Sequence, residues 1–234
     1  MRAAWLPRWL TTPPSRCAVC GAWPASALCA GCAAGFALPL HRCRLCALPL
    51  TGAAEVCGAC LREPPPLDAC FAAVSYAYPW STLVARFKFS GEPGWAETFA
   101  GRMALVPGAA QELQRADLVL PLPLAPRRLA ERGFNQALLL ARSLAPARTE
   151  PRLLLRLRET GSQATLDRKA RHLNMRHAFG VDPLRAAEVA GRAVLLVDDV
   201  MTSGASLHSA ALALRQAGAL RVSALVLART DQPH

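Results

Sequence analysis

Eight of the nine cysteines lie within the first 60 residues and form four C-x2-C pairs. The stretches between successive pairs are eight, ten and ten residues long, and the pairs are Cys17/Cys20, Cys29/Cys32, Cys43/Cys46 and Cys57/Cys60. A C-x2-C turn lets two thiolates face one cation, and two such turns complete a tetrahedral shell of four sulfurs. Because this stretch has almost no periodic apolar pattern, it needs a bound metal to fold. The spacing therefore predicts two structural Zn²⁺ sites.

The pairing of the four turns is open at the level of sequence. Joining neighbours closes the shortest loops and costs the least chain entropy, but an interleaved arrangement satisfies the same spacing. An iron–sulfur cluster is the main alternative to zinc, since it also takes four thiolates. Disulfides are disfavoured by the odd cysteine total, which leaves Cys70 over as an expected inert, buried residue. A shell of cysteines alone leaves the metal no open position, so we expect no catalytic zinc.

The composition changes after the last cysteine pair. Residues 63–66 read Glu-Pro-Pro-Pro, which forms a stiff, extended connection. Beyond it, apolar runs typical of strands occur at 71–77, 117–120, 153–157, 193–197 and 222–227, and helical patterns at 80–89, 129–144, 168–176 and 207–216. This alternation predicts an α/β fold with a mostly parallel sheet flanked by helices. We expect an arm at 1–16, a double zinc-ribbon module at 17–62, a proline-rich linker at 63–69 and the α/β domain at 70–230.

The net charge of +11 comes almost entirely from arginine, because only Lys88 and Lys169 are lysines. A basic surface attracts nucleic acids, phosphate esters and anionic membranes. The same excess also arises by compositional drift in a GC-rich genome, so the charge alone does not decide between partners. No apolar run approaches the roughly 20 residues of a membrane span, and the opening residues lack the apolar core of a secretory signal. We expect a cytoplasmic protein.

Residues 194–206 read VLLVDDVMTSGAS and combine an apolar strand, two carboxylates and a hydroxyl-rich turn. Asp198 and Asp199 follow the strand, at the edge of a parallel sheet where ligands collect. Adjacent carboxylates are poor core residues, and they suit the hydroxyls of a ribose, directly or with Mg²⁺ nearby. The turn at 202–206 opens a helix, so its N–H groups and hydroxyls can cradle an anion, and Gly204 lets a phosphate approach the backbone. The segment predicts a site for a ribose 5-phosphate.

A helix N-cap is the simpler interpretation of the same turn, since serine and threonine fill that role routinely. The paired aspartates alone, or Thr-Ser-Gly alone, would favour it. The complete run in this order favours the ligand site. The sequence contains no G-x4-G-K-[ST] motif and no G-x-G-x-x-G after a strand, which are the main rival phosphate motifs.

The same thirteen residues resemble the phosphoribosyl pyrophosphate signature of the type I phosphoribosyltransferases. Further segments narrow the resemblance to the ComF/GntX branch, the amidophosphoribosyltransferase-like proteins associated with natural competence. These segments are the paired cysteines, RFKFSG at 86–91, PLPL at 121–124, ERGFNQ at 131–136, AF at 178–179, and Gln163, Arg171 and Asn174. The resemblance runs from about residue 17 to about residue 228 and implies a type I phosphoribosyltransferase-like fold.

The resemblance also assigns roles to individual residues. It implies ribose contacts from Asp198 and Asp199, and it implies 5-phosphate contacts from Thr202, Ser203, Gly204, Ala205 and Ser206. The pyrophosphate would be met by Lys88 and by the loop around Arg127, Arg128 and Arg132, because guanidinium groups bind phosphate oxygens in pairs. An ordinary solvated basic face is the alternative for these arginines. Asn135, Gln136, Gln163, Arg171 and Asn174 are either ligand contacts or structural hydrogen-bonding residues.

Two functions follow from these expectations. The first is an enzyme that binds phosphoribosyl pyrophosphate with Mg²⁺ and transfers the phosphoribosyl group to an unidentified acceptor, with Asp198, Asp199 and Lys88 as the catalytic residues. The second is a non-catalytic component of the DNA-uptake machinery that binds single-stranded DNA, or senses phosphoribosyl pyrophosphate, alongside competence proteins. The basic charge suits single-stranded DNA, but no aromatic stacking platform is evident among the charges.

Overall fold

The structure is a computed structural model that describes residues 15–23, 25–157 and 178–231. The chain divides into two compact units, Met1–Leu38 and Pro39–His234. This division falls between the second and third C-x2-C pairs, whereas composition places a linker at 63–69. The domain boundaries expected from the sequence stay a prediction. The helix expected at 168–176 lies outside the described residues.

The first unit contains one short helix, α1 (Ala30–Phe36), and none of the residues of that helix is buried. Cys29 is its N-cap, and the thiol accepts a hydrogen bond from the Cys32 backbone N–H. An isolated antiparallel bridge joins Ser15 to Ala25. Among the described residues of this unit, only Cys17 and Leu28 are buried apolar side chains. A unit with so little core depends on something other than apolar burial for its stability.

The second unit is built on a parallel sheet with strand order β1-β6-β5-β2. The strands are β1 (Ala69–Ser75), β2 (Leu118–Pro121), β5 (Ala193–Met201) and β6 (Arg221–Arg229). The two central strands are apolar almost throughout, and Val194 of β5 lies opposite Val222 of β6. This composition is typical of strands covered on both faces. The predicted α/β fold with a mostly parallel sheet is confirmed.

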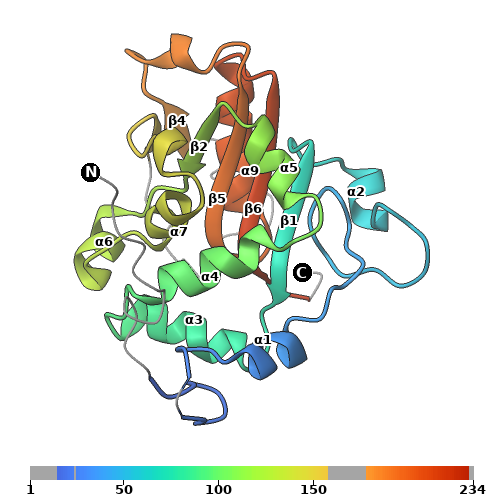
Figure 1. The fold of residues 1–234 in the computed structure, drawn as a ribbon. Coiled ribbons are helices and arrows are strands. Elements are labelled where there is room, and N and C mark those ends of the chain that lie inside the picture. Colours follow the sequence, from blue (N-terminus) through green and yellow to red (C-terminus); the bar gives the residue numbers. More distant parts are fainter. Residues whose placement is uncertain (1–14, 24, 158–177, 232–234) are drawn as a thin grey trace, which may run out of the picture. The chain divides into compact units, whose positions relative to one another are not determined.

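Helices cover both faces of this sheet (Figure 1). One face packs against α4 (Trp95–Ala104), α5 (Ala109–Arg115) and α7 (Gln136–Leu144), and α9 (Ala205–Gln216) lies on the other. The apolar cluster beneath α9 includes Leu196, Ala224 and Leu214. A separate antiparallel pair, β3 (Leu154–Arg156) with β4 (Phe179–Val181), packs beside α9. The remaining elements are α2 (Gly58–Arg62), α3 (Trp80–Phe89), α6 (Pro126–Arg132), η2 (Pro146–Arg148) and η3 (Ala186–Glu188).

Two sequence-based expectations differ from the observed elements. The single helix expected at 129–144 is two helices, α6 and α7, because Gly133 adopts a left-handed conformation with φ of 78° and Asn135 caps the start of α7. The strand expected to end at 197 continues to Met201, because β6 pairs with it along its whole length. None of the helices in the described part of the chain is long and apolar enough to cross a membrane.

Candidate functional site

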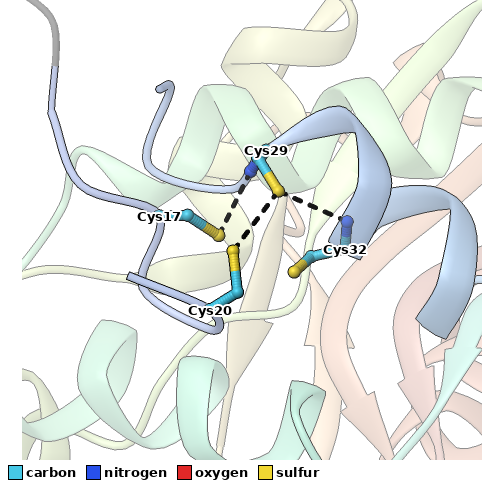
Figure 2. Close-up of side chains that lie close together, drawn as sticks. All are labelled: Cys17, Cys20, Cys29 and Cys32. Carbon is cyan, nitrogen blue, oxygen red and sulfur yellow. Dashed lines mark hydrogen bonds between the residues drawn. The ribbon is translucent and has the colours of Figure 1, made fainter. Parts of the chain in front are cut away.

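Cys17, Cys20, Cys29 and Cys32, here called the outer cluster, bring their sulfur atoms together within the first unit (Figure 2). All four Sγ atoms lie within 4.8 Å of one another, and Cys20 Sγ is 3.7 Å from Cys29 Sγ. A tetrahedral zinc ion with Zn–S bonds of about 2.3 Å has sulfurs about 3.8 Å apart. The Cys29 N–H points at Cys17 Sγ over 3.4 Å, an N–H to sulfur contact that favours the thiolate. The geometry fits a zinc ion.

Cys43, Cys46, Cys57 and Cys60, here called the inner cluster, form an equivalent group within the second unit. Cys46 Sγ lies 3.7 Å from Cys57 Sγ, and the Cys57 N–H points at Cys43 Sγ over 3.3 Å. All four residues are buried, and they belong to the apolar cluster that also contains Leu196 and Leu214. Both clusters join neighbouring C-x2-C turns, so among the two pairings that the sequence left open the structure has the one that closes the shorter loops.

The edge of the sheet opens at Asp198. Pro121, the last residue of β2, pairs with Val197, so the pairing of β5 with β2 ends just before Asp198. On its other side β5 remains paired, with Asp198 opposite Val226 of β6. The two aspartates therefore lie within the strand and not after it, but they stand where the pairing with β2 has ended. This is the carboxyl edge of the sheet that the sequence predicted as the ligand position.

Asp198 and the turn that follows line a pocket of about 140 Å³. The other lining residues are Val200, Met201, Thr202, Ser203, Gly204, Ala205, Ser206 and Leu207. The predicted 5-phosphate residues are thus brought together with one of the two aspartates. Because α9 begins at Ala205, its first N–H groups lie at this pocket, where they favour an anion.

The backbone conformation at position 204 favours glycine. Its φ of 81° is a left-handed conformation, and a Cβ there would collide with Met201 Cε and lie 2.9 Å from His208 Nε2. The backbone can therefore turn sharply from β5 into α9. The 202–206 loop owes its shape to this residue.

Asp199 is held by a lysine and does not line the pocket described above. Lys88, in the last turn of α3, places its Nζ 2.7 Å from Asp199 Oδ1, and the two side chains are only 16% and 9% exposed. Asp198 has a different electrostatic environment. Burial, and then the charge of Asp199, raise the pKa of Asp198 to about 7, while the charge of Lys88 acts in the opposite direction. The site therefore combines a paired carboxylate with a neighbouring carboxyl group that holds its proton more strongly.

The predicted pyrophosphate arginines lie on α6, where two of them are exposed. Arg127 pairs with Glu131 at 2.9 Å on the surface, and Arg128 is exposed. Arg132 is partly buried, with its guanidinium 5.1 Å from the centre of the Phe89 ring. The structure thus brings Arg132, but not Arg127, close to the aromatic residue that follows Lys88.

Two further candidates, Asn135 and Gln136, lie at the start of α7. Asn135 accepts a hydrogen bond from the Leu138 N–H at 3.3 Å and donates to the Leu122 carbonyl at 3.0 Å, which gives it a structural role. Gln136 is 1% exposed and accepts from Arg132 at 3.1 Å, but its Nε2 has no hydrogen-bond partner among the described residues. Gln163, Arg171 and Asn174 lie outside the described residues.

Sequence reasoning missed Arg229, the last residue of β6. Its side chain is buried and donates hydrogen bonds to the carbonyls of Cys46 and Met201, at 2.9 Å and 3.3 Å. These partners are far away in the sequence, so no local pattern identifies them. A charged residue at the end of an otherwise apolar strand was the only available signal.

Known proteins match both this site and most of the chain. The phosphoribosyl transferase domain family matches residues 131–234. DNA utilization protein YhgH of Escherichia coli K12 is 31% identical over 233 residues, covering 94% of this chain and all of that protein. Competence protein F of Haemophilus influenzae is 32% identical over 86% of this chain and 90% of its own length. Competence protein ComFC of Bacillus subtilis is 32% identical over 81% and 78%. The chain belongs to the ComF family of phosphoribosyltransferase-like proteins.

Proposed function

We propose that this protein binds phosphoribosyl pyrophosphate with Mg²⁺ and transfers its phosphoribosyl group to an acceptor. The pocket lined by Asp198 and the 202–206 loop carries this proposal. It combines a carboxyl group for ribose hydroxyls with an anion cradle at a helix N-terminus, one after the other along the chain. A ribose that bears a 5-phosphate matches both parts at once.

The residues of the chain then have separate tasks in the reaction. The acceptor forms a bond to the anomeric carbon, the bond from that carbon to the pyrophosphate oxygen breaks, and the acceptor loses a proton. Asp198 and the loop fix the ribose, so the anomeric carbon is held in one orientation. Mg²⁺ would neutralise charge on the leaving pyrophosphate, and Asp198 and Asp199 are the oxygen donors available beside the pocket. Arg132 and Lys88 supply positive charge near the two aspartates.

The direct test is calorimetric titration of the full chain with phosphoribosyl pyrophosphate, with and without Mg²⁺. We expect binding that depends on Mg²⁺, and about tenfold or greater weakening in Ser203→Ala combined with Thr202→Val, because charge-assisted hydrogen bonds to phosphate are lost. The control is Thr51→Val, a substitution of an exposed threonine far from the loop in sequence, and we expect it to leave the affinity unchanged. Absence of Mg²⁺-dependent binding to the wild-type protein contradicts the proposal.

Our second candidate is binding of single-stranded DNA in the setting of natural competence. The names of the relatives, DNA utilization protein and competence protein, favour that setting. The exposed arginines of α6 and the ring of Phe89, 72% exposed beside Arg132, provide charge and one stacking surface. A salt-dependent affinity for an oligonucleotide that survives Asp199→Ala would favour this candidate. Release of pyrophosphate that the same substitution abolishes would favour the enzyme.

A further inference from the structure

Arg229 connects the inner cluster to the beginning of the 202–206 loop. The residue ends β6 and is only 6% exposed. Its Nε donates to the carbonyl oxygen of Cys46, one of the four cluster residues, at 2.9 Å. Its Nη1 donates to the carbonyl oxygens of Met201 and Thr202, at 3.3 Å and 2.5 Å. One planar group therefore bonds to a metal-binding turn on one side and to the pocket on the other.

A buried guanidinium needs negative charge nearby, because burying an unpaired ion is costly. None of the ion pairs among the residues that the structure describes includes Arg229, whose hydrogen-bond partners there are carbonyl oxygens and the Thr230 hydroxyl. A zinc ion with four thiolates carries a net charge of about −2. A metal-filled inner cluster would thus supply negative charge beside Arg229, whose Nε donates to the Cys46 carbonyl.

The same turn of the inner cluster is held by a second arginine. Arg42 Nη1 donates to the carbonyl of Ala47 at 3.0 Å, directly after the carbonyl that Arg229 holds. Ala47 has a φ of 56°, the only positive value among the described residues other than glycine. Both carbonyls around this left-handed position are therefore fixed by guanidinium groups. Such a conformation persists where its surroundings hold it in place.

We propose that Arg229 is a positioning residue for the phosphoribosyl pocket, and that it makes phosphate binding depend on the metal of the inner cluster. This inference rests on the function proposed above. When the metal leaves, the four cysteines are no longer held around one ion, and the turn that carries the Cys46 carbonyl loses its fixed position. Arg229 then loses a fixed partner on that side, and the backbone at 201–202 loses its anchor. The loop then populates its binding conformation less often. The apparent affinity for phosphoribosyl pyrophosphate falls in proportion to the population of that conformation.

Linkage makes the dependence reciprocal. If the inner metal strengthens binding of phosphoribosyl pyrophosphate, then phosphoribosyl pyrophosphate strengthens retention of the inner metal by the same factor. Arg229 carries this coupling, so its loss removes the effect in both directions. In the described residues, the sulfurs of the outer cluster interact with sulfur atoms and backbone N–H groups of the same four cysteines, and we expect no coupling there.

The experiment uses the full chain and compares Arg229→Met with Leu225→Ala, a substitution in the buried part of the same strand. We expect Arg229→Met to bind phosphoribosyl pyrophosphate about tenfold more weakly while it keeps its zinc, since hydrogen bonds from a charged donor are lost. Leu225→Ala binds as the wild type does at temperatures where it is folded. Competition with a chelator then measures zinc retention. We expect phosphoribosyl pyrophosphate to increase zinc retention in the wild type and in Leu225→Ala, but not in Arg229→Met.

Arg229→Lys keeps the experiment decisive if Arg229→Met fails to fold. A lysine retains the charge, but its single ammonium lacks the fork that spans Cys46 and Thr202. Weaker ligand binding at full zinc content supports the proposal, and unchanged binding with unchanged ligand-dependent zinc retention overturns it.

A readout without ligand separates this inference from the proposed function. Backbone amides of residues 203–207 should exchange with solvent faster in the arginine variants than in Leu225→Ala. If the wild type binds no phosphoribosyl pyrophosphate but this difference is present, the proposed function fails and the positioning role stands. If the exchange rates are equal, the positioning role fails.

Discussion

The two cysteine clusters have the same spacing and nearly the same geometry, but they lie in different surroundings. The outer cluster has one buried residue, Cys17, and Cys20 is exposed, in a unit with almost no described apolar core. The inner cluster is buried at all four positions within the main apolar cluster of the second unit. A metal at the outer cluster therefore takes the place of a core, whereas a metal at the inner cluster is part of one.

This difference has consequences for stability and for the site. If both clusters bind zinc, loss of the outer metal would remove the main source of order from the described part of the first unit. Loss of the inner metal would leave four thiols inside a packed interior, next to the buried guanidinium of Arg229. The inner cluster is also linked to the pocket at Met201, through the hydrogen bonds of Arg229. Equal motifs can thus have unequal effects on one protein.

The largest effect should come from removing two inner ligands. Cys57→Ser with Cys60→Ser should abolish the cooperative unfolding transition of the second unit. Structural zinc contributes roughly 10 kcal/mol in small zinc domains, as much as the whole stability of a typical domain. Thermal scans by circular dichroism and elemental analysis of zinc measure the outcome.

The ninth cysteine provides the matched control for this change. Cys70→Ala alters a buried thiol of the same apolar cluster that is not one of the four ligands, so we expect a loss of only about 1 kcal/mol and no loss of zinc. A folded inner-site variant with an unchanged melting temperature would show that the inner metal is dispensable.

Much of the architecture could be predicted because its causes are local. The continuous apolar runs identified the central strands, and the helical pattern at 80–89 identified α3 with its observed bounds. The amphipathic helix α4 was missed, although Trp95, Phe99 and Met103 repeat at helical spacing. The difference in burial between the clusters is also visible in the sequence. The inner turns are interspersed with Leu48, Leu50 and Val56, which pack against the core.

The remaining features depend on contacts between distant parts of the chain. The end of β5 is set by pairing with β6, and the role of Arg229 arises from a partner 183 residues away in sequence. The family resemblance implied that Lys88 meets pyrophosphate, but its 2.7 Å pair with Asp199 depends on the folded sheet edge. The pyrophosphate role of Lys88 stays a prediction. Periodicity reports which face of an element is buried, and it does not report what that face meets.

A moderate effect should appear as a dependence of the unfolding free energy on pH. This dependence should be confined to the second unit, which contains Asp198. An unfolded aspartate ionises near pH 4, whereas the pKa of Asp198 is about 7 in the fold because of burial and the charge of Asp199. Between these values the native state holds more protons than the unfolded state. The unfolding free energy therefore falls as the pH rises from 4 to 7, by on the order of 3 kcal/mol from this group.

Asp198→Asn removes this contribution, because an amide does not ionise. Denaturant unfolding at several pH values should show a flatter profile for Asp198→Asn than for the wild type, and Glu97→Gln, on the exposed side of α4, should follow the wild type. Parallel profiles for wild type and Asp198→Asn would contradict the raised pKa. A pH dependence of stability found only in the first unit would contradict the assignment of this effect to the second unit.

The smallest effect on the sheet should come from the outer cluster, through the substitution that matches the inner one. Cys29→Ser with Cys32→Ser should remove one zinc per chain and make residues 15–38 sensitive to proteolysis, because few apolar contacts hold this stretch. The unfolding free energy of the second unit should change by less than about 0.5 kcal/mol, as for changes at independent sites. A loss as large as that of the inner pair would show that the two units unfold as one. In that case the similar spacing of the clusters would be a better guide to their roles than their burial.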